Sequence, residues 1–222
     1  MKRVPEPELM NGIDQARAYA FADFEAPHSS FIRQFANTFP EYKTGKYVLD
    51  LGCGTCDISI RFAKAYHNCR IHGIDGSNTM LSFGKLAVTR NPQIKYRIRL
   101  FSETLPTISL NRKKYDTIIS NSLLHHLHDP YVLWNTIKQF ASSGAEVFVM
   151  DLRRPDTITD TRIMREKYTA NEPEILQRDF YNSLLAAFDT KEIKEQLSNT
   201  GLDHLSVKPE GDRHVIICGK MK

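Results

Sequence analysis

The sequence predicts a doubly wound α/β fold, in which helices cover a mostly parallel sheet with one antiparallel strand. Short apolar segments alternate with amphipathic segments whose apolar residues recur every three or four positions. A glycine turn leads from an apolar strand pattern at 47–51 into a helical pattern at 58–65. Strand candidates at 202–208 and 214–219 form a closing hairpin, which supplies the antiparallel strand. Ligands of such sheets bind outside the carboxyl ends of the parallel strands.

The 222 residues suit one domain with a full α/β core. We expect residues 1–44 to form an N-terminal helical cap and residues 45–222 to form the core, with a helical insertion at about 156–188. The cap either closes over the ligand or only covers one face of the sheet. The same periodicities predict an extended arm at 1–11, helices at 14–24, 29–39, 77–91, 129–144, 174–188 and 189–201, and strands at 70–75, 94–101, 115–120 and 145–150.

Bulk composition is that of a globular protein, with 41% hydrophobic and 25% charged residues. The net charge of +4 is too small to indicate nucleic-acid binding by itself. No apolar segment follows the first residues and no run reaches membrane-spanning length, so we expect neither a signal peptide nor a membrane anchor. Four cysteines do not suggest a disulfide framework, which favours a reducing, cytoplasmic location.

The glycine turn has the chemistry of a site for an amino acid joined to a nucleoside. Gly52 allows the turn, and Gly54 lets a ligand lie against the backbone. A dinucleotide site would have a third glycine at position 57, but Asp57 stands there and Asp50 precedes the turn. Two acids suit an ammonium group better than a diphosphate. Asp75 ends the next strand, where an acid can hold both ribose hydroxyls, so the pattern points to S-adenosylmethionine.

Three motifs, at residues 48–55, 73–77 and 115–130, resemble those of class I S-adenosylmethionine-dependent methyltransferases. The closest likeness is to the small-molecule branch that includes the ubiquinone and menaquinone C-methyltransferases, and it covers residues 46–152 motif by motif. The resemblance implies a Rossmann-like sheet of seven strands. It also implies that residues after the third strand flank the adenine and that residues after the fourth back the methionine portion. With the glycine turn, the expected cofactor-binding residues are Asp50, Gly52, Cys53, Gly54, Asp75, Gly76, Met80, Ser102, Glu103, Thr104, Asn121 and Ser122.

His125, His126 and His128 follow the fourth strand, where a methyl acceptor would meet the sulfonium. With an ordinary pKa of about 6.5, His125 or His126 could take a proton from an acceptor hydroxyl, thiol or carbon acid, which makes them the catalytic candidates. Alternatively they cap the next helix or pack beside the cofactor, because methyl transfer can proceed by positioning alone. Cys53 and Cys56 form a Cys-x-x-Cys pair, but without a second pair we expect no metal site.

Arginines follow the fifth strand, occupy the helical insertion and begin the last strand, so the topology brings them toward the same edge. Arginines around one pocket suit the capture of a carboxylate or a phosphate. The alternative is surface ion pairing with Asp151, Asp179 and Asp212. The expected substrate-binding residues are Tyr19, Arg153, Arg178, Tyr181, Asn182 and Arg213, of which three share a helix face at spacings of three and four.

The sequence therefore predicts an S-adenosylmethionine-dependent methyltransferase that acts on a small, anionic molecule. One alternative is an RNA methyltransferase, but the basic stretch 111–114 precedes a strand and lies at the edge away from the cofactor, and no RNA-binding module is appended. The other is a protein that binds the cofactor without catalysis. The expected partner is a small-molecule methyl acceptor, with neither a membrane nor a nucleic acid, and the sequence leaves the oligomeric state open.

Overall fold

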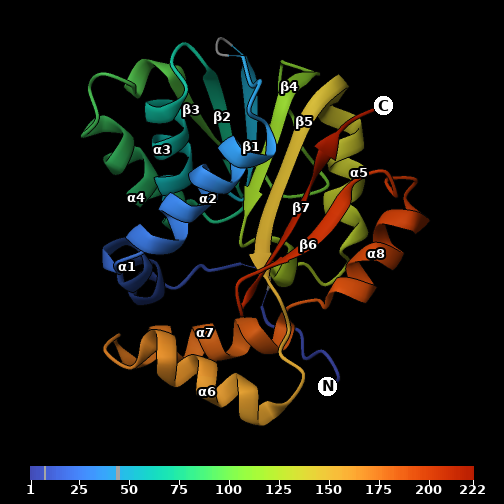
Figure 1. The fold of residues 1–222 in the computed structure, drawn as a ribbon. Coiled ribbons are helices and arrows are strands. Elements are labelled where there is room, and N and C mark those ends of the chain that lie inside the picture. The colour runs from blue at the N-terminus through green and yellow to red at the C-terminus, as the bar shows by residue number, and fades with distance from the viewer. Residues whose placement is uncertain (8, 44–45) are drawn as a thin grey trace.

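The structure is a computed structural model that describes residues 1–7, 9–43 and 46–222. Its centre is a seven-stranded sheet with the strand order β3-β2-β1-β4-β5-β7-β6 (Figure 1). The expected boundary between cap and core, at residues 44 and 45, lies outside the described residues. The strands are β1 (Tyr47–Leu51), β2 (Arg70–Asp75), β3 (Ile98–Ser102), β4 (Tyr115–Asn121), β5 (Ala141–Leu152), β6 (Ser206–Glu210) and β7 (His214–Lys220).

The predicted fold class is confirmed. Strands β1 to β5 pair in parallel, whereas β7 is antiparallel to both of its neighbours, β5 and β6. Strand β1, an inner strand of the sheet, is buried from Val48 to Leu51, as expected for a strand covered on both faces. The carboxyl ends of the parallel strands meet at the lower edge of the sheet in Figure 1, and the start of β7 returns to that edge.

Helices cover both faces of the sheet (Figure 1). On one face, α2, α3 and α4 pack over an aromatic core in which the ring of Phe35 lies 4.9 Å from that of Phe62 and 5.5 Å from that of Phe148. On the other face, α5 and α8 bury Trp134, whose indole N–H donates to Gln196 at 2.9 Å. No helix of the described chain is long and apolar enough to cross a membrane. The helices are α1 (Ile13–Phe21), α2 (Glu25–Thr38), α3 (Asp57–Ala65), α4 (Asn78–Thr89), η1 (Lys95–Arg97), η2 (Leu124–His126), α5 (Tyr131–Phe140), α6 (Ile158–Thr169), α7 (Glu174–Ala186) and α8 (Thr190–Asn199).

The helices α6 and α7 form a pair outside the carboxyl edge of the sheet, and the N-terminal segment runs between this pair and the sheet (Figure 1). The N–H of Val4 donates to the carbonyl of Leu185 at the end of α7. The guanidinium of Arg3 lies 3.9 Å from the centre of the Phe188 ring. The expected extended arm is therefore a fixed part of this edge.

Several expected elements have other bounds: the helix expected at 29–39 is α2, which begins at Glu25, and the strand expected at 202–208 is β6, which begins at Ser206. Two further differences have a visible local cause. The strand expected at 94–101 begins only at Ile98, because Arg97 turns its guanidinium back to the carbonyl of Ala63 and the preceding residues form a 3-10 turn. The helix expected to run to Gly144 ends at Phe140. Gly144 instead lies within β5 with φ of 75°, in a left-handed conformation that glycine adopts without strain.

A capping box begins α8. The carboxylate of Asp189 accepts from the N–H groups of Lys191 and Glu192, and the Glu192 carboxylate accepts from the N–H of Asp189. Both carboxylates also pair with the buried guanidinium of Arg154, at 3.2 and 2.8 Å. The cap thus connects α8 to the end of β5.

We predict that Asp189→Ala lowers the free energy of unfolding by about 1–2 kcal/mol, because it removes a helix cap. Urea denaturation followed by circular dichroism measures the effect. Asp203→Ala, at an exposed aspartate outside any helix, is the matched control and should change the value by less than about 0.5 kcal/mol. Equal effects of the two substitutions would contradict this role for the cap.

Candidate active site

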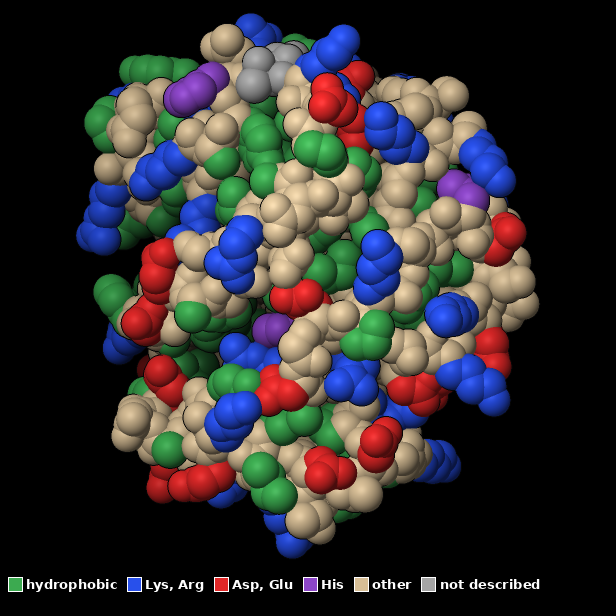
Figure 2. Space-filling view, in the orientation of Figure 1, with side chains coloured by type: hydrophobic (Ala, Val, Ile, Leu, Met, Phe, Trp, Pro, Cys, Tyr) green, Lys and Arg blue, Asp and Glu red, His purple; other side chains and the backbone are tan. Residues whose placement is uncertain are grey.

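A cavity of about 620 Å³ lies at the carboxyl edge of the sheet, within the size range of about 300–1,000 Å³ that is usual for small-molecule sites. Its walls come from the glycine turn, the ends of β2 and β4, helices α1 and α2, and the α6–α7 pair. Figure 2 shows the hollow in this face of the molecule, above the α6–α7 pair. The cavity therefore lies where a doubly wound sheet binds its ligand.

The glycine turn brings the backbone close to the cavity. Gly52 and Gly54 have φ of 73° and 51°, in the left-handed region that favours glycine. A Cβ on Gly52 would lie 2.9 Å from the side chain of Leu123, too close for any other residue to fit there without a shift. Cys56 also has a positive φ of 68° and immediately precedes α3, so this turn contains one strained residue that is not glycine.

Two carboxylates stand at this end of the cavity. Asp75 accepts from the N–H groups of Gly54 and Ser77, both at 2.8 Å, and burial raises the pKa of its carboxyl group despite these bonds. Asp50 is almost fully buried and accepts from the Ser59 hydroxyl at 2.6 Å. Burial raises the pKa of Asp50 to about 7. Near neutral pH the carboxyl group of Asp50 can therefore be either neutral or charged.

The structure brings the expected cofactor-binding residues together with one exception. Ser102 does not line the cavity, because the chain turns toward it only at Glu103, whose N–H donates to the carbonyl of Asp75 at 3.1 Å. The side chain that ends β3 is exposed instead. The expected residues that do line the cavity are Asp50, Gly52, Cys53, Gly54, Asp75, Gly76, Met80, Glu103, Thr104, Asn121 and Ser122.

A buried ion pair orders the other end of the cavity. Nδ1 of His125 lies 2.5 Å from the carboxylate of Asp151, which also accepts from the N–H of Leu124 at 2.7 Å. Although burial disfavours charge on both groups, Asp151 raises the pKa of His125, and His125 holds the pKa of Asp151 below its usual value. Because Nδ1 makes this bond, Nε2 is the ring nitrogen of His125 that faces the cavity, where it lies 3.6 Å from the Glu6 carboxylate.

His126 lies beside His125 but differs from it in the direction of its pKa shift. Burial and the neighbouring His125 lower the pKa of His126 to about 3, so the imidazole is neutral at physiological pH. Its Nδ1 is buried and has no hydrogen-bond partner among the described residues. The two rings are 4.2 Å apart between their centres, and both line the cavity. Both catalytic candidates are therefore at the site, each with a ring nitrogen that faces Glu6 and forms no hydrogen bond with the described residues.

Sequence reasoning missed Glu6, because the arm at 1–11 has no periodic pattern and no motif. The Arg3 side chain fixes this arm by donating to the carbonyls of Ala186, His125 and Leu127. Glu6 then lies at the cavity, where its carboxylate accepts from the Ser183 hydroxyl at 2.9 Å. Burial raises the pKa of Glu6.

The expected cluster of arginines does not form at the cavity. Of Arg153, Arg178 and Arg213, the last alone lines it. Helix α7 faces the cavity with Leu176, Asp179, Phe180 and Ser183, so the neighbouring face of this helix points away. The side chain of Arg178 is 67% exposed and pairs with Asp179, and Arg153 donates to the carbonyl of Asp212. The substrate-binding candidates that do not line the cavity are Arg153, Arg178, Tyr181 and Asn182.

Arg213 lines the cavity, and its guanidinium lies 3.6 Å from the centre of the Tyr168 ring. Burial lowers its pKa, yet a guanidinium stays charged at any physiological pH. No carboxylate of the described chain lies within ion-pair distance of it. Asp212, the adjacent acid, pairs with Lys167 and Tyr168 instead. Arg213 is therefore a cation that faces the cavity without an anion.

The N-terminal helices supply an aromatic wall of the cavity. Tyr19, the remaining substrate-binding candidate, and Phe24 line the cavity with their rings 4.6 Å apart. Burial raises the pKa of Tyr19 to about 12. His28 stacks on Phe24 and bonds to Asp57 at 2.6 Å, while Arg61 pairs with the same carboxylate. Asp57 is thus already compensated, and Asp50 and Asp75 are the acids left for a ligand.

Comparisons with known proteins agree with this fold. A family model described as a methyltransferase domain matches residues 42–201, so the chain belongs to this family, the class I S-adenosylmethionine-dependent methyltransferases. A ubiquinone biosynthesis O-methyltransferase of Coxiella burnetii is 26% identical over 110 residues, or 50% of this chain and 45% of that protein. The chain spans about half the length of the curated relatives it matches.

Solved structures show the same fold over nearly the whole chain. A S-adenosylmethionine-dependent methyltransferase from Aquifex aeolicus superposes with a TM-score of 0.67 at 15% identity, covering 94% of this chain and 99% of that one. Magnesium protoporphyrin IX methyltransferase from Synechocystis, with S-adenosylhomocysteine bound, has a TM-score of 0.64 at 15% identity, covering 96% and 95%. These likenesses establish the fold.

We predict that Asp50 makes stability depend on pH. Its pKa is about 7 in the folded state and about 3.9 in the unfolded state. As the pH rises between these values, the carboxyl group ionises in the unfolded state but stays protonated in the folded state, so the wild-type protein loses stability. Asp50→Asn removes this effect. The stability of the variant relative to wild type should therefore increase between about pH 4 and 7, by at most about 1.4 kcal/mol per pH unit, and stay constant above.

Urea denaturation of both proteins across this pH range is the measurement, and Asp203→Asn is the control at an exposed aspartate. A difference between wild type and Asp50→Asn that does not vary with pH would show that Asp50 has an ordinary pKa.

Proposed function

We propose that this protein transfers the methyl group of S-adenosylmethionine to a small, anionic molecule with an apolar body. The observation that carries the proposal is one continuous cavity with two unlike ends. One end has the glycine turn and two carboxylates, and the other has two histidines and an arginine that lacks an anion. A cofactor that is both nucleoside and amino acid suits the first end, and an anionic acceptor suits the second.

At the cofactor end, Asp75 would accept from the two ribose hydroxyls, as an acid at the end of the second strand does in this class of fold. Glu103 and Thr104 line the cavity next to it, where they would flank the adenine. Asp50, which precedes the glycine turn, would compensate the positive charge of the ammonium group of the methionine portion. A charged ligand there favours the ionised form of Asp50, against the effect of burial.

At the acceptor end, Arg213 would hold a carboxylate or a phosphate. A half-buried guanidinium that lacks a counter-ion loses part of its hydration, and a planar anion that accepts two of its N–H groups offsets that loss. Tyr168, Phe180, Leu176 and Phe24 give the walls around it an apolar and aromatic character. The acceptor that fits is therefore a flat or aliphatic molecule with one anionic group.

Between the two ends, His125 and His126 face the place where the acceptor's nucleophilic atom would meet the sulfonium. Nε2 of His125 and Nδ1 of His126, the ring nitrogens that face the Glu6 carboxylate, would contact that atom or its proton. Positioning would supply the remaining rate acceleration, because holding two reactants in the right geometry lowers the entropic part of the activation barrier.

The alternative of an RNA acceptor is less well supported. In the basic stretch 111–114, the guanidinium of Arg112 lies 3.3 Å from the centre of the ring of Tyr47, which begins β1. This stretch is therefore at the amino end of the strands, opposite the cavity. In the face shown in Figure 2, basic and acidic side chains are interspersed and form no single-sign track.

We predict that S-adenosylhomocysteine binds in the micromolar range, on the order of −8 kcal/mol, and that Asp75→Ala weakens binding by roughly 1.5–3 kcal/mol through the loss of charged hydrogen bonds. Titration calorimetry is the measurement, with Asp203→Ala as the control. Circular dichroism of each variant verifies folding. Tight binding of NADH with no binding of S-adenosylhomocysteine would refute the proposed cofactor.

We predict that Arg213→Lys raises the KM for an anionic acceptor at least tenfold, because lysine lacks the planar fork that a carboxylate accepts. Release of S-adenosylhomocysteine can be screened with a panel of hydroxylated aromatic acids and their methyl esters, where the acids should be preferred. Arg178→Lys is the matched control and should leave the KM unchanged, since its side chain lies outside the cavity. Preference for the neutral esters, or equal effects of both substitutions, would refute an anionic acceptor.

A further inference from the structure

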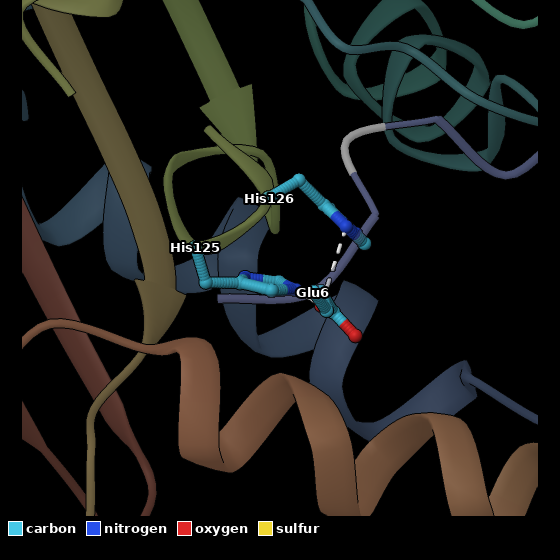
Figure 3. Close-up of side chains that lie close together, drawn as sticks. All are labelled: Glu6, His125 and His126. Atoms are coloured by element: carbon cyan, nitrogen blue, oxygen red, sulfur yellow. Dashed lines mark ion pairs between the residues drawn. The ribbon is translucent and has the colours of Figure 1, made fainter. Parts of the chain in front are cut away.

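Three potential metal ligands converge at the acceptor end of the cavity, and they come from distant parts of the chain. Figure 3 shows Glu6 of the N-terminal segment with His125 and His126 of η2, all directed at one another. One ligand atom from each residue lies within 4.8 Å of the other two. Two imidazoles and a carboxylate are a ligand set that zinc and related divalent metals use in proteins.

The distances between these atoms are those between ligands of one metal ion. The Glu6 carboxylate oxygen is 3.3 Å from Nδ1 of His126 and 3.6 Å from Nε2 of His125. Neither contact is a hydrogen bond, and Nδ1 of His126 has no hydrogen-bond partner among the described residues. Bonds of about 2.0–2.1 Å in a tetrahedral site place ligand atoms roughly 3.3–3.4 Å apart. A small shift of the side chains would therefore centre a metal ion among them.

The surroundings hold the ligands in the orientation that metal binding requires. Asp151 bonds to Nδ1 of His125, which directs Nε2 toward Glu6, the arrangement in which a carboxylate orients a metal-binding histidine. Nδ1 of His126 is buried and has no hydrogen-bond partner among the described residues. The carboxylates of Glu6 and Asp151 both lie against these imidazoles, so the cluster places two acids where a cation would sit.

We propose that Glu6, His125 and His126 form a site for one divalent transition metal ion of the zinc class, with its remaining coordination position open to the cavity. All three residues line the cavity, so a bound ion is accessible from it. Because Glu6 belongs to the N-terminal arm, the ion would also bind this arm to η2. Metal binding itself does not depend on the proposed function.

The role of the open position does rest on the proposed function. A hydroxyl or thiol of the acceptor bound there would lose its proton to water more readily, because the metal stabilises the resulting anion. That anion would then attack the methyl carbon as the carbon–sulfur bond of the cofactor breaks, leaving S-adenosylhomocysteine. Arg213 would hold the acceptor's other anionic group.

The test uses the full chain, stripped of metal with a chelator and dialysed. Zinc titrated in a calorimeter should bind with one ion per chain, and cobalt(II) should give visible absorption bands of a low-coordinate site with nitrogen and oxygen ligands. Glu6→Gln and His126→Asn should each weaken zinc binding by at least roughly 100-fold, since loss of a direct ligand exceeds the 10–100-fold cost of losing an outer-shell partner. Glu195→Gln and His67→Ala, at exposed positions, are the matched controls and should bind zinc as wild type does.

A third variant separates this site from the cysteine pair in the glycine turn, whose sulfur atoms are 3.8 Å apart. Cys53→Ser combined with Cys56→Ser should leave cobalt absorption unchanged. Binding of S-adenosylhomocysteine to Glu6→Gln, measured in parallel, verifies that the variant is folded and reports separately on the cofactor. The proposal is overturned if wild type binds no stoichiometric zinc, if Glu6→Gln and His126→Asn bind it like the controls, or if the cysteine variant abolishes it.

Discussion

The acceptor end of the site depends on one buried carboxylate. Asp151 lies at the end of β5 with 1% of its surface exposed, and a buried charge must be paired to be tolerated. Its oxygens accept from the N–H groups of Leu124 and Leu152 and from the ring of His125. These bonds fix η2 against the sheet and set which nitrogen of His125 faces the cavity. The carbonyls of η2 then receive Arg3, which holds the N-terminal arm and Glu6 in place.

The two ends of the cavity differ in how their charges are compensated. At the cofactor end, His28 and Arg61 compensate Asp57, which leaves Asp50 and Asp75 for a ligand. At the acceptor end a positive charge lacks a partner, because the guanidinium of Arg213 lies over the ring of Tyr168 and pairs with no carboxylate of the described chain. A ligand pair with an ammonium at one end and an anion at the other would complete both. This complementarity is the physical basis of the proposed reaction.

The sequence predicted the sheet and the cofactor end because both are local. Strand β1, the turn and α3 are contiguous, and Asp75 follows at the end of the next strand, so the rule on carboxyl ends was enough to bring them together. The acceptor end is not local. Whether Arg178 or Asp179 faces the cavity depends on how α7 is rotated about its axis, and the polar face of a helix does not reveal that rotation. Glu6 could not be placed at all, since an arm without periodicity gives no sign that Arg3 bonds to the carbonyl of His125 in η2.

The central claim is that one cavity holds the cofactor with its sulfur toward the histidines and Arg213. A crystal structure of the complex with S-adenosylhomocysteine tests it most directly. The account predicts the ribose at Asp75, the adenine beside Glu103 and Thr104, and the sulfur facing the space between His126 and Arg213. A ligand bound outside this cavity, or one with its adenine against His125 and its sulfur turned away from Arg213, would contradict it.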